Sequence, residues 1–291
     1  MGGVNFIAVK FSNEELAPMY GATLRFAGAT LIFVAFGLLR RVPWPTRREF
    51  IGTFLYGVLG FGVAYALLYY ALVRLPAGTV SVIMASVPLV TLVFAVLHRQ
   101  ERFSLRGVIG GFLAMAGIGV LSTGTLSGEI GIGYFIAALL AVVAVAESSI
   151  AIKGFPMADP VAVNGIAMGV GALFLAVFSL ILGEPWVVPS MDSTWLALGW
   201  LVVFGSVGLF VLYLYVISRW TASATNYAVT LMPVVAVTAA ALLADEPVTV
   251  SLLVGGALVL LAVYVGALSG GPSPSGEEPG AAREPVEVPS S

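Results

Sequence analysis

Long runs without a charged residue dominate this chain, and they determine the solvent in which it can fold. Each run lies between charged or titratable residues: Glu49 to Arg74, Arg74 to His98, Arg106 to Glu129, Asp159 to Glu184, Asp192 to Arg219, and Arg219 to Asp245. A helix needs roughly 20 apolar residues to cross a bilayer core of about 30 Å, and each run is long enough. Most of the chain is therefore predicted to span a membrane.

The composition agrees, because 59% of the residues are hydrophobic and only 10% are charged, unlike those of a soluble globular domain. A transmembrane β-barrel would alternate apolar and polar residues in segments of roughly ten. Here the runs of Leu, Val, Ala and Gly are continuous. The predicted fold class is an all-α integral membrane protein, whose helices pair their own backbone groups.

Reading from charge to charge predicts ten transmembrane helices joined by short loops. Their expected ranges are 1–12, 16–39, 50–73, 77–97, 105–123, 130–152, 160–183, 194–217, 222–243 and 248–268. The largest polar stretch, 270–291, is rich in Pro, Ser, Gly and Glu, which predicts a disordered tail.

Basic residues are enriched in cytoplasmic loops, so they orient this arrangement. With a cytoplasmic N-terminus, most of them fall on the inner side: Arg40, Arg41, Arg47, Arg48, Arg99, Arg102, Arg106, Lys153, Arg219 and Arg283. Arg74 falls in an outer loop, while Lys10 and Arg25 lie within predicted helices. We expect a multi-pass protein of the plasma membrane with both termini in the cytoplasm.

A shift of 145 positions aligns the second half of the sequence with the first. It pairs Gly60 with Gly205, Tyr70 with Tyr215, Arg74 with Arg219, Pro88 with Pro233, and Glu101 with Glu246. We interpret 1–123 and 130–268 as two copies of a five-helix unit. Because five is odd, the second copy enters the membrane from the opposite side, and such inverted repeats are typical of secondary transporters.

The chain carries the segment Gly3 to Lys10, Pro18 followed by Leu24-Arg25-Phe26, Pro88 with Glu101 after it, and the same signals in the second half. With these markers, 3–268 resembles the EamA-like transporters of the drug/metabolite transporter (DMT) superfamily. The resemblance implies ten helices around a central cavity, lined by the first, third, fourth, sixth, eighth and ninth helices. It also implies export of an amino acid or a related small organic metabolite.

The first predicted helix is short for its place in the repeat. Gly131 precedes Ser148 by 17 positions in the second copy, whereas four residues precede the matching Asn5. A helix of about twelve residues is near 18 Å long and cannot cross the hydrocarbon core. We expect this helix to be truncated and the natural start to lie upstream of Met1, which a longer transcript with an apolar extension would support.

Charges inside a membrane are expensive, so each one needs a reason. Arg25 could bind an anionic substrate group, form a structural ion pair or reach the outer face. Lys10 ends the first predicted helix and could face the cavity mouth or anchor the helix at the interface. Glu147 lies deep within a predicted helix and is the candidate proton-coupling residue. Its alternatives are contact with lipid headgroups and an ion pair with Lys153.

Aromatic side chains offer further candidates for substrate binding. Tyr65 and Tyr69 lie on the third predicted helix and Tyr213 on the eighth, in related places of the two halves. They could stack on an organic solute. Tyrosines near a membrane interface also form aromatic belts, which is the alternative.

Polar groups and prolines within the predicted helices complete the candidates. Asn5, Ser81 and Asn226 could contact substrate, or could join helices by hydrogen bonds. Pro88 and Pro233 each remove a backbone hydrogen bond and are predicted to kink their helices. Such kinks could act as hinges, or could be fixed bends that shape the cavity.

Several functions are excluded by residue counts. Neither Lys10 nor Lys153 follows a glycine, so no Walker-type phosphate loop is encoded. The chain has no cysteine, and its one histidine is His98, so a His-rich metal centre and a histidine-based triad are not expected. We expect no metal, no cofactor and no enzymatic activity. The net charge of −2 gives no reason to expect nucleic acid as a partner.

The predicted function is secondary transport of a small molecule by alternating access between the two halves. The expected partners are this substrate and the lipid bilayer, and a homodimer is compatible with the sequence. A passive facilitator or exchanger is the alternative within transport. From another class, a lipid scramblase predicts a polar groove open to lipid, and a structural membrane subunit predicts no cavity.

Overall fold

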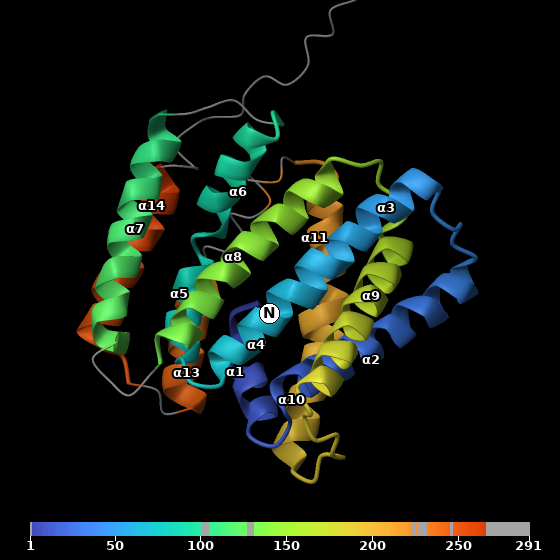
Figure 1. Ribbon diagram of the computed structural model, residues 1–291, viewed down its shortest axis with the longest axis horizontal. Coiled ribbons are helices and arrows are strands. Elements are labelled where there is room, and N and C mark those ends of the chain that lie inside the picture. Colours follow the sequence, from blue (N-terminus) through green and yellow to red (C-terminus); the bar gives the residue numbers. More distant parts are fainter. Residues whose placement is uncertain are drawn as a thin grey trace, which may run out of the picture.

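The computed structural model describes residues 2–100, 105–126, 131–220, 222, 225, 232–244 and 247–265. Within these ranges the chain forms helices and no strand, which confirms the predicted all-α class (Figure 1). The elements are α1 (Gly2–Asn13), α2 (Pro18–Arg40), α3 (Arg47–Tyr56), η1 (Gly57–Val63), α4 (Ala64–Leu72), α5 (Ala77–Met84), α6 (Val87–Leu97), α7 (Leu105–Leu126), α8 (Ile132–Lys153), α9 (Pro160–Ile181), α10 (Asp192–Val202), η2 (Val203–Gly208), α11 (Leu209–Ile217), α13 (Met232–Leu243) and α14 (Val250–Val263).

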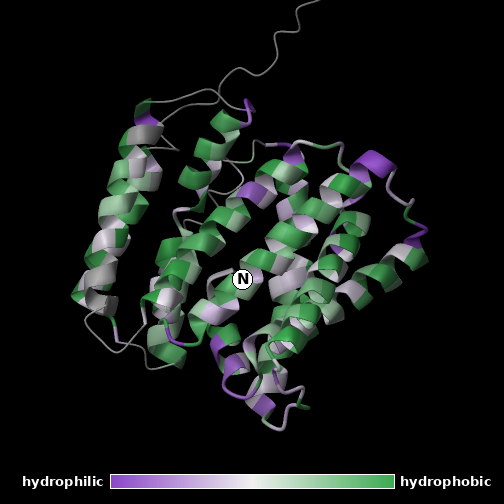
Figure 2. Cartoon of the chain, in the orientation of Figure 1, coloured by the Kyte–Doolittle hydropathy of each residue, from purple (hydrophilic) through white to green (hydrophobic). Residues whose placement is uncertain are grey.

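Six helical segments in the described ranges are long and apolar enough to cross a membrane. They are Pro18–Arg40, Arg47–Leu72, Ala77–Leu97, Ile132–Lys153, Pro160–Ile181 and Asp192–Ile217. Large apolar side chains also cover the outside, including Leu31, 70% exposed, and Leu196, 75% exposed. Figure 2 shows strongly hydrophilic residues mainly at helix ends and connections. Because such an exterior is stable in lipid and not in water, the chain is a multi-pass membrane protein.

Two of these segments are interrupted by π-helical turns. η1 separates α3 from α4, and η2 separates α10 from α11. Shifting Gly57–Val63 by 145 positions gives 202–208, which overlaps Val203–Gly208. A π-helical turn bonds each N–H five residues back instead of four, and such turns often lie at functional sites.

The segment 77–97 is broken near the proline that was predicted to kink it. α5 ends at Met84, and α6 begins at Val87 with Pro88 in its first turn. A proline is well tolerated there because the first helical N–H groups have no partner within the helix. Pro233 is the second residue of α13, and residues 226–231 lie outside the described ranges.

Two carboxylates join the α1–α2 connection to the α9–α10 connection. Glu184 accepts hydrogen bonds from the backbone N–H groups of Met19 and Tyr20, at 3.2 and 3.0 Å, in the first turn of α2. An acid is favourable there because the amino end of a helix carries partial positive charge. Glu15, in the α1–α2 connection, accepts hydrogen bonds from the N–H and hydroxyl of Ser190, in the α9–α10 connection. The two halves of the chain are therefore bonded at this end of the bundle.

Acid should weaken this junction. The hydroxyl and N–H donors of Ser190 lower the pKa of the Glu15 carboxyl from 4.5 to about 2. A carboxylate with a lowered pKa stabilises the fold fully above its unfolded pKa, and the contribution is lost as the pH falls through the folded value. Thermal unfolding in detergent should therefore lose stability between pH 4.5 and 2 more steeply in the wild type than in Glu15→Gln. The control Glu14→Gln should behave as wild type, and equal slopes for all three would contradict the prediction.

Candidate functional site

A cavity of about 130 Å³ lies among the helices and takes residues from both halves of the chain. Its described lining consists of Gly2, Asn5, Phe6, Val9, Arg25, Tyr56, Gly60, Ala64, Tyr65, Leu68, Met84, Val145, Ser148, Leu209, Phe210, Tyr213 and Met232. These residues belong to α1, α2, α3, η1, α4, α5, α8, α11 and α13. α7 and α14 contribute none of them and pack along each other at one side of the bundle (Figure 1).

One face of α1 supplies the cavity with an amide. Gly2, Asn5, Phe6 and Val9 follow the spacing of three and four residues that places side chains on one helical face. The Asn5 amide donates from Nδ2 to the Gly205 carbonyl at 3.4 Å, and its Oδ1 accepts from the indole Nε1 of Trp200 at 3.2 Å. Asn5 therefore joins α1 to α10 and η2 as well as lining the cavity.

Among the described lining residues Arg25 is the charged one, although only 1% of its surface is exposed. Its Nε donates to Ser206 Oγ at 2.9 Å and one terminal nitrogen donates to the Gly205 carbonyl at 2.9 Å. Its Cζ also lies 5.0 Å from the ring centre of Phe26 and 4.9 Å from that of Tyr65. The side chain thus points into the bundle instead of reaching a membrane face.

The backbone of η2 makes this arrangement possible. The carbonyl of Gly205 accepts from both Arg25 and Asn5, which a carbonyl oxygen with two lone pairs can do. A Cβ on Gly205 would lie 2.5 Å from Oδ1 of Asn5. A side chain at position 205 would therefore displace the Asn5 amide from its place against η2.

The three candidate tyrosines occupy different positions. Tyr65 lines the cavity and meets the Phe26 ring edge to face at 4.6 Å. Tyr213 also lines it, and its hydroxyl shares a 2.8 Å hydrogen bond with Ser149. Tyr69 is fully buried, and its ring centre lies 6.4 Å from that of Tyr65. It is not among the described lining residues. Tyr65 and Tyr213 therefore line the cavity with Arg25, and Tyr69 lies outside the described lining but still interacts with the Arg25 side chain.

The remaining candidates are not part of the described lining. Ser81 is fully buried and donates its hydroxyl to the Gly78 carbonyl of its own helix at 2.7 Å. Lys10 lies in the last turn of α1, half-buried. Asn226 lies outside the described residues. Lys153 donates to the Ile217 carbonyl at 2.9 Å, which links α8 to the end of α11.

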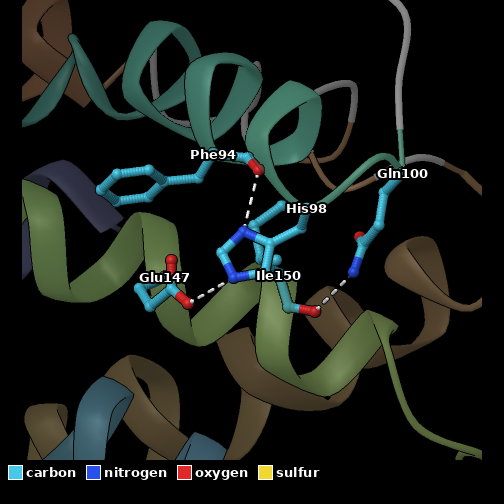
Figure 3. Close-up of polar contacts among 5 residues, drawn as sticks. All are labelled: Phe94, His98, Gln100, Glu147 and Ile150. Atoms are coloured by element: carbon cyan, nitrogen blue, oxygen red, sulfur yellow. Dashed lines mark hydrogen bonds and ion pairs between the residues drawn. The ribbon is translucent and has the colours of Figure 1, made fainter.

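Glu147 lies on α8 beside the end of α6, and its carboxylate faces His98 (Figure 3). Nε2 of His98 lies 3.3 Å from Oε1 of Glu147, and Nδ1 lies 2.9 Å from the Phe94 carbonyl oxygen. Gln100 donates to the Ile150 carbonyl at 3.3 Å in the same region. Glu147 is thus close to the cavity-lining Val145 and Ser148 in sequence but is not itself among the lining residues.

The contacts of His98 define how many protons this pair holds. A carbonyl oxygen can only accept, so Nδ1 must carry a hydrogen and donate it to Phe94. The Nε2 to Oε1 contact then needs one further proton, either on the imidazole with Glu147 ionised or on the carboxyl with His98 neutral. The side chains of His98 and Glu147 are 47% and 33% exposed.

Several lining residues were not identified from the sequence, including Tyr56, Gly60, Ser148 and Phe210. Tyr56, Gly60, Ala64 and Leu68 recur every four residues, which is a detectable helical face. That face is mostly apolar, so the spacing alone predicts burial and not a cavity. Ser148 is buried and donates to the Val145 carbonyl of its own helix at 2.8 Å.

Comparison with known proteins places this arrangement in a family. The sequence model of the EamA-like transporter family matches residues 1–123 and 131–267. A protein of Archaeoglobus fulgidus named "Uncharacterized transporter" is 28% identical over 270 residues, covering 90% of this chain and 93% of the relative. The "Uncharacterized inner membrane transporter YedA" of Escherichia coli is 31% identical over 240 residues, covering 81% of this chain and 76% of the relative. A solved structure titled "Crystal structure of protein" shares the fold, with a TM-score of 0.63 and 21% identity over 92% of this chain and 95% of that one.

Proposed function

Since the chain belongs to the EamA-like transporter family, we propose that it is a secondary transporter that exports amino acids or related small organic metabolites by alternating access. The observation that carries this proposal is the cavity built from both halves of the chain, with Arg25, Asn5 and two tyrosines in its wall. A site between two halves can open to either side of a membrane when the halves move against each other.

The proposed architecture is ten transmembrane helices in two inverted five-helix repeats, with both termini in the cytoplasm. Three observations support it. The family model matches two stretches, 1–123 and 131–267. η1 and η2 lie at positions related by the 145-residue shift. Pro88 lies in the first turn of α6, and Pro233, related to it by the same shift, lies in α13; we propose that these two places act as hinges.

A lipid scramblase is the less favoured alternative because a second cavity, between α2 and α9, has an apolar wall. The volume of this second cavity is about 430 Å³. Its described wall is made of apolar residues such as Phe33, Leu38 and Val161, with Arg41 as the one charged residue. Headgroups crossing a bilayer need a continuous polar path, which this wall does not offer. A structural subunit would not need the central cavity.

Efflux from proteoliposomes tests the proposed function. Vesicles loaded with labelled amino acids and related metabolites should release at least one of them faster than empty-membrane controls. Ala64→Phe should lose most of this efflux, because Ala64 lines the cavity and the added ring would fill it. Gly199→Phe should retain it, because no atom lies within 4 Å of a Cβ at that position. Leakage equal to that of protein-free vesicles for every solute would refute transport of this class.

A further inference from the structure

The wall of the central cavity contains a cation whose described bonding partners are all neutral. Arg25 bonds to a hydroxyl and a carbonyl and lies against two aromatic faces. No carboxylate of the described residues lies within ion-pair distance of it. A buried cation is stabilised mainly by an anion, and ring faces and neutral dipoles replace one only in part. The site therefore favours a negatively charged group from a ligand.

The guanidinium has donors left for such a group. Arginine carries five N–H bonds; the bonds to Ser206 and Gly205 use two of them, and the Tyr65 and Tyr69 side chains also interact with the guanidinium. A carboxylate takes two parallel N–H donors from an arginine in a well-defined geometry. Because Ser206 and Gly205 hold the guanidinium in place, little side-chain freedom is lost when a ligand binds.

The same wall offers no acid for a positively charged ligand. None of its described residues is Asp or Glu. Apart from Arg25 the described wall is neutral: Asn5 and Ser148 are polar, and most of the other residues, such as Phe6, Leu68 and Phe210, are apolar or aromatic. An ammonium group in this space would be repelled by Arg25 and would lose its water without gaining a counter-ion.

We propose that the substrate is a small organic monocarboxylate with a neutral, apolar body, bound through its carboxylate to Arg25. The transport role rests on the proposed function, and within it this inference favours the related metabolites that carry one negative charge and no ammonium group over amino acids. Zwitterionic amino acids bind more weakly, because their ammonium group has no acidic partner. Organic cations are excluded by the charge of Arg25.

Three solutes share the same branched apolar body and differ only in their charged groups. They are 4-methylpentanoate, which is a carboxylate, leucine, which is a zwitterion, and 3-methylbutylamine, which is a cation. Binding to the purified protein is measured by calorimetry in detergent, and flux is measured in proteoliposomes. The carboxylate is expected to bind roughly 10- to 100-fold more tightly than leucine, the span of a charge-assisted hydrogen bond, and the amine should show no binding. Equal or tighter binding of leucine or the amine would overturn the proposal.

Variants of Arg25 give a second readout. Arg25→Gln should weaken binding of 4-methylpentanoate by roughly 10- to 100-fold, whereas Arg25→Lys should keep the order of the three solutes. Unchanged affinity in a folded Arg25→Gln protein would overturn the proposal. Because Arg25 also bonds Ser206 and Gly205, this variant could fail to fold, and the wild-type ranking then decides alone.

The binding and flux measurements together distinguish a failure of this inference from a failure of the proposed function. Binding of the carboxylate without any flux would leave the site assignment standing and refute the transporter. Flux of leucine or the amine without binding of the carboxylate would leave the transporter standing and refute the assignment.

Discussion

Exchanging Gly171 for leucine is expected to leave little folded protein. Gly171 lies on α9 where this helix crosses η1, and a Cβ there would collide with the Cβ of Phe61. It would also lie 3.0 Å from the Phe61 carbonyl carbon and 3.2 Å from the Gly62 nitrogen. A backbone cannot rotate away as a flexible side chain can, so the two helices would have to separate. Overpacking of this kind costs about 1–3 kcal/mol or more.

The measurement is the yield and thermal stability of the two glycine variants in one detergent. Gly199→Leu on α10 is the matched control, because it adds the same side chain where no atom lies within 4 Å. We expect this control to elute as a single peak with near wild-type stability, and Gly171→Leu to aggregate or unfold at a much lower temperature. A Gly171→Leu protein as stable as the control would mean that α9 and η1 do not approach this closely.

Much of the helical layout follows from where the charges stand. The ranges 16–39 and 130–152 agree with Pro18–Arg40 and Ile132–Lys153 to within two residues at each end. Charged residues end spans because a bilayer excludes them, so they are reliable boundaries. No charged residue marks the positions of the π-helical turns in this way. Their residues are the same small and apolar types that form an α-helix, and only packing against neighbouring helices selects the wider turn.

The candidate site was predictable in its residue types but not in its contacts. A buried arginine is conspicuous in an apolar helix, and Arg25 lines the cavity. Its partners Ser206 and Gly205 lie about 180 positions away in sequence, and no local pattern indicates them. Ser81 illustrates the opposite case, because a mid-helix serine that bonds its own backbone looks the same in sequence as one that bonds a ligand.

Glu147→Gln is expected to abolish gradient-driven accumulation while leaving downhill efflux. We place the coupling proton at the contact between Oε1 of Glu147 and Nε2 of His98, which lie 3.3 Å apart. Glutamine cannot take up or release that proton, so a change of conformation would no longer be coupled to it. The comparison is uptake of labelled substrate into proteoliposomes with and without an imposed proton gradient.

Gln100→Ala is the control for this last prediction, because Gln100 also bonds α8, through the Ile150 carbonyl, yet cannot titrate. It should retain the response to the gradient, which would show that the loss in Glu147→Gln is due to the proton and not to the packing of α8. Flux that is unaffected by both the gradient and the substitution would make the protein a facilitator or exchanger. The pair of Glu147 and His98 would then serve only to hold the end of α6 against α8.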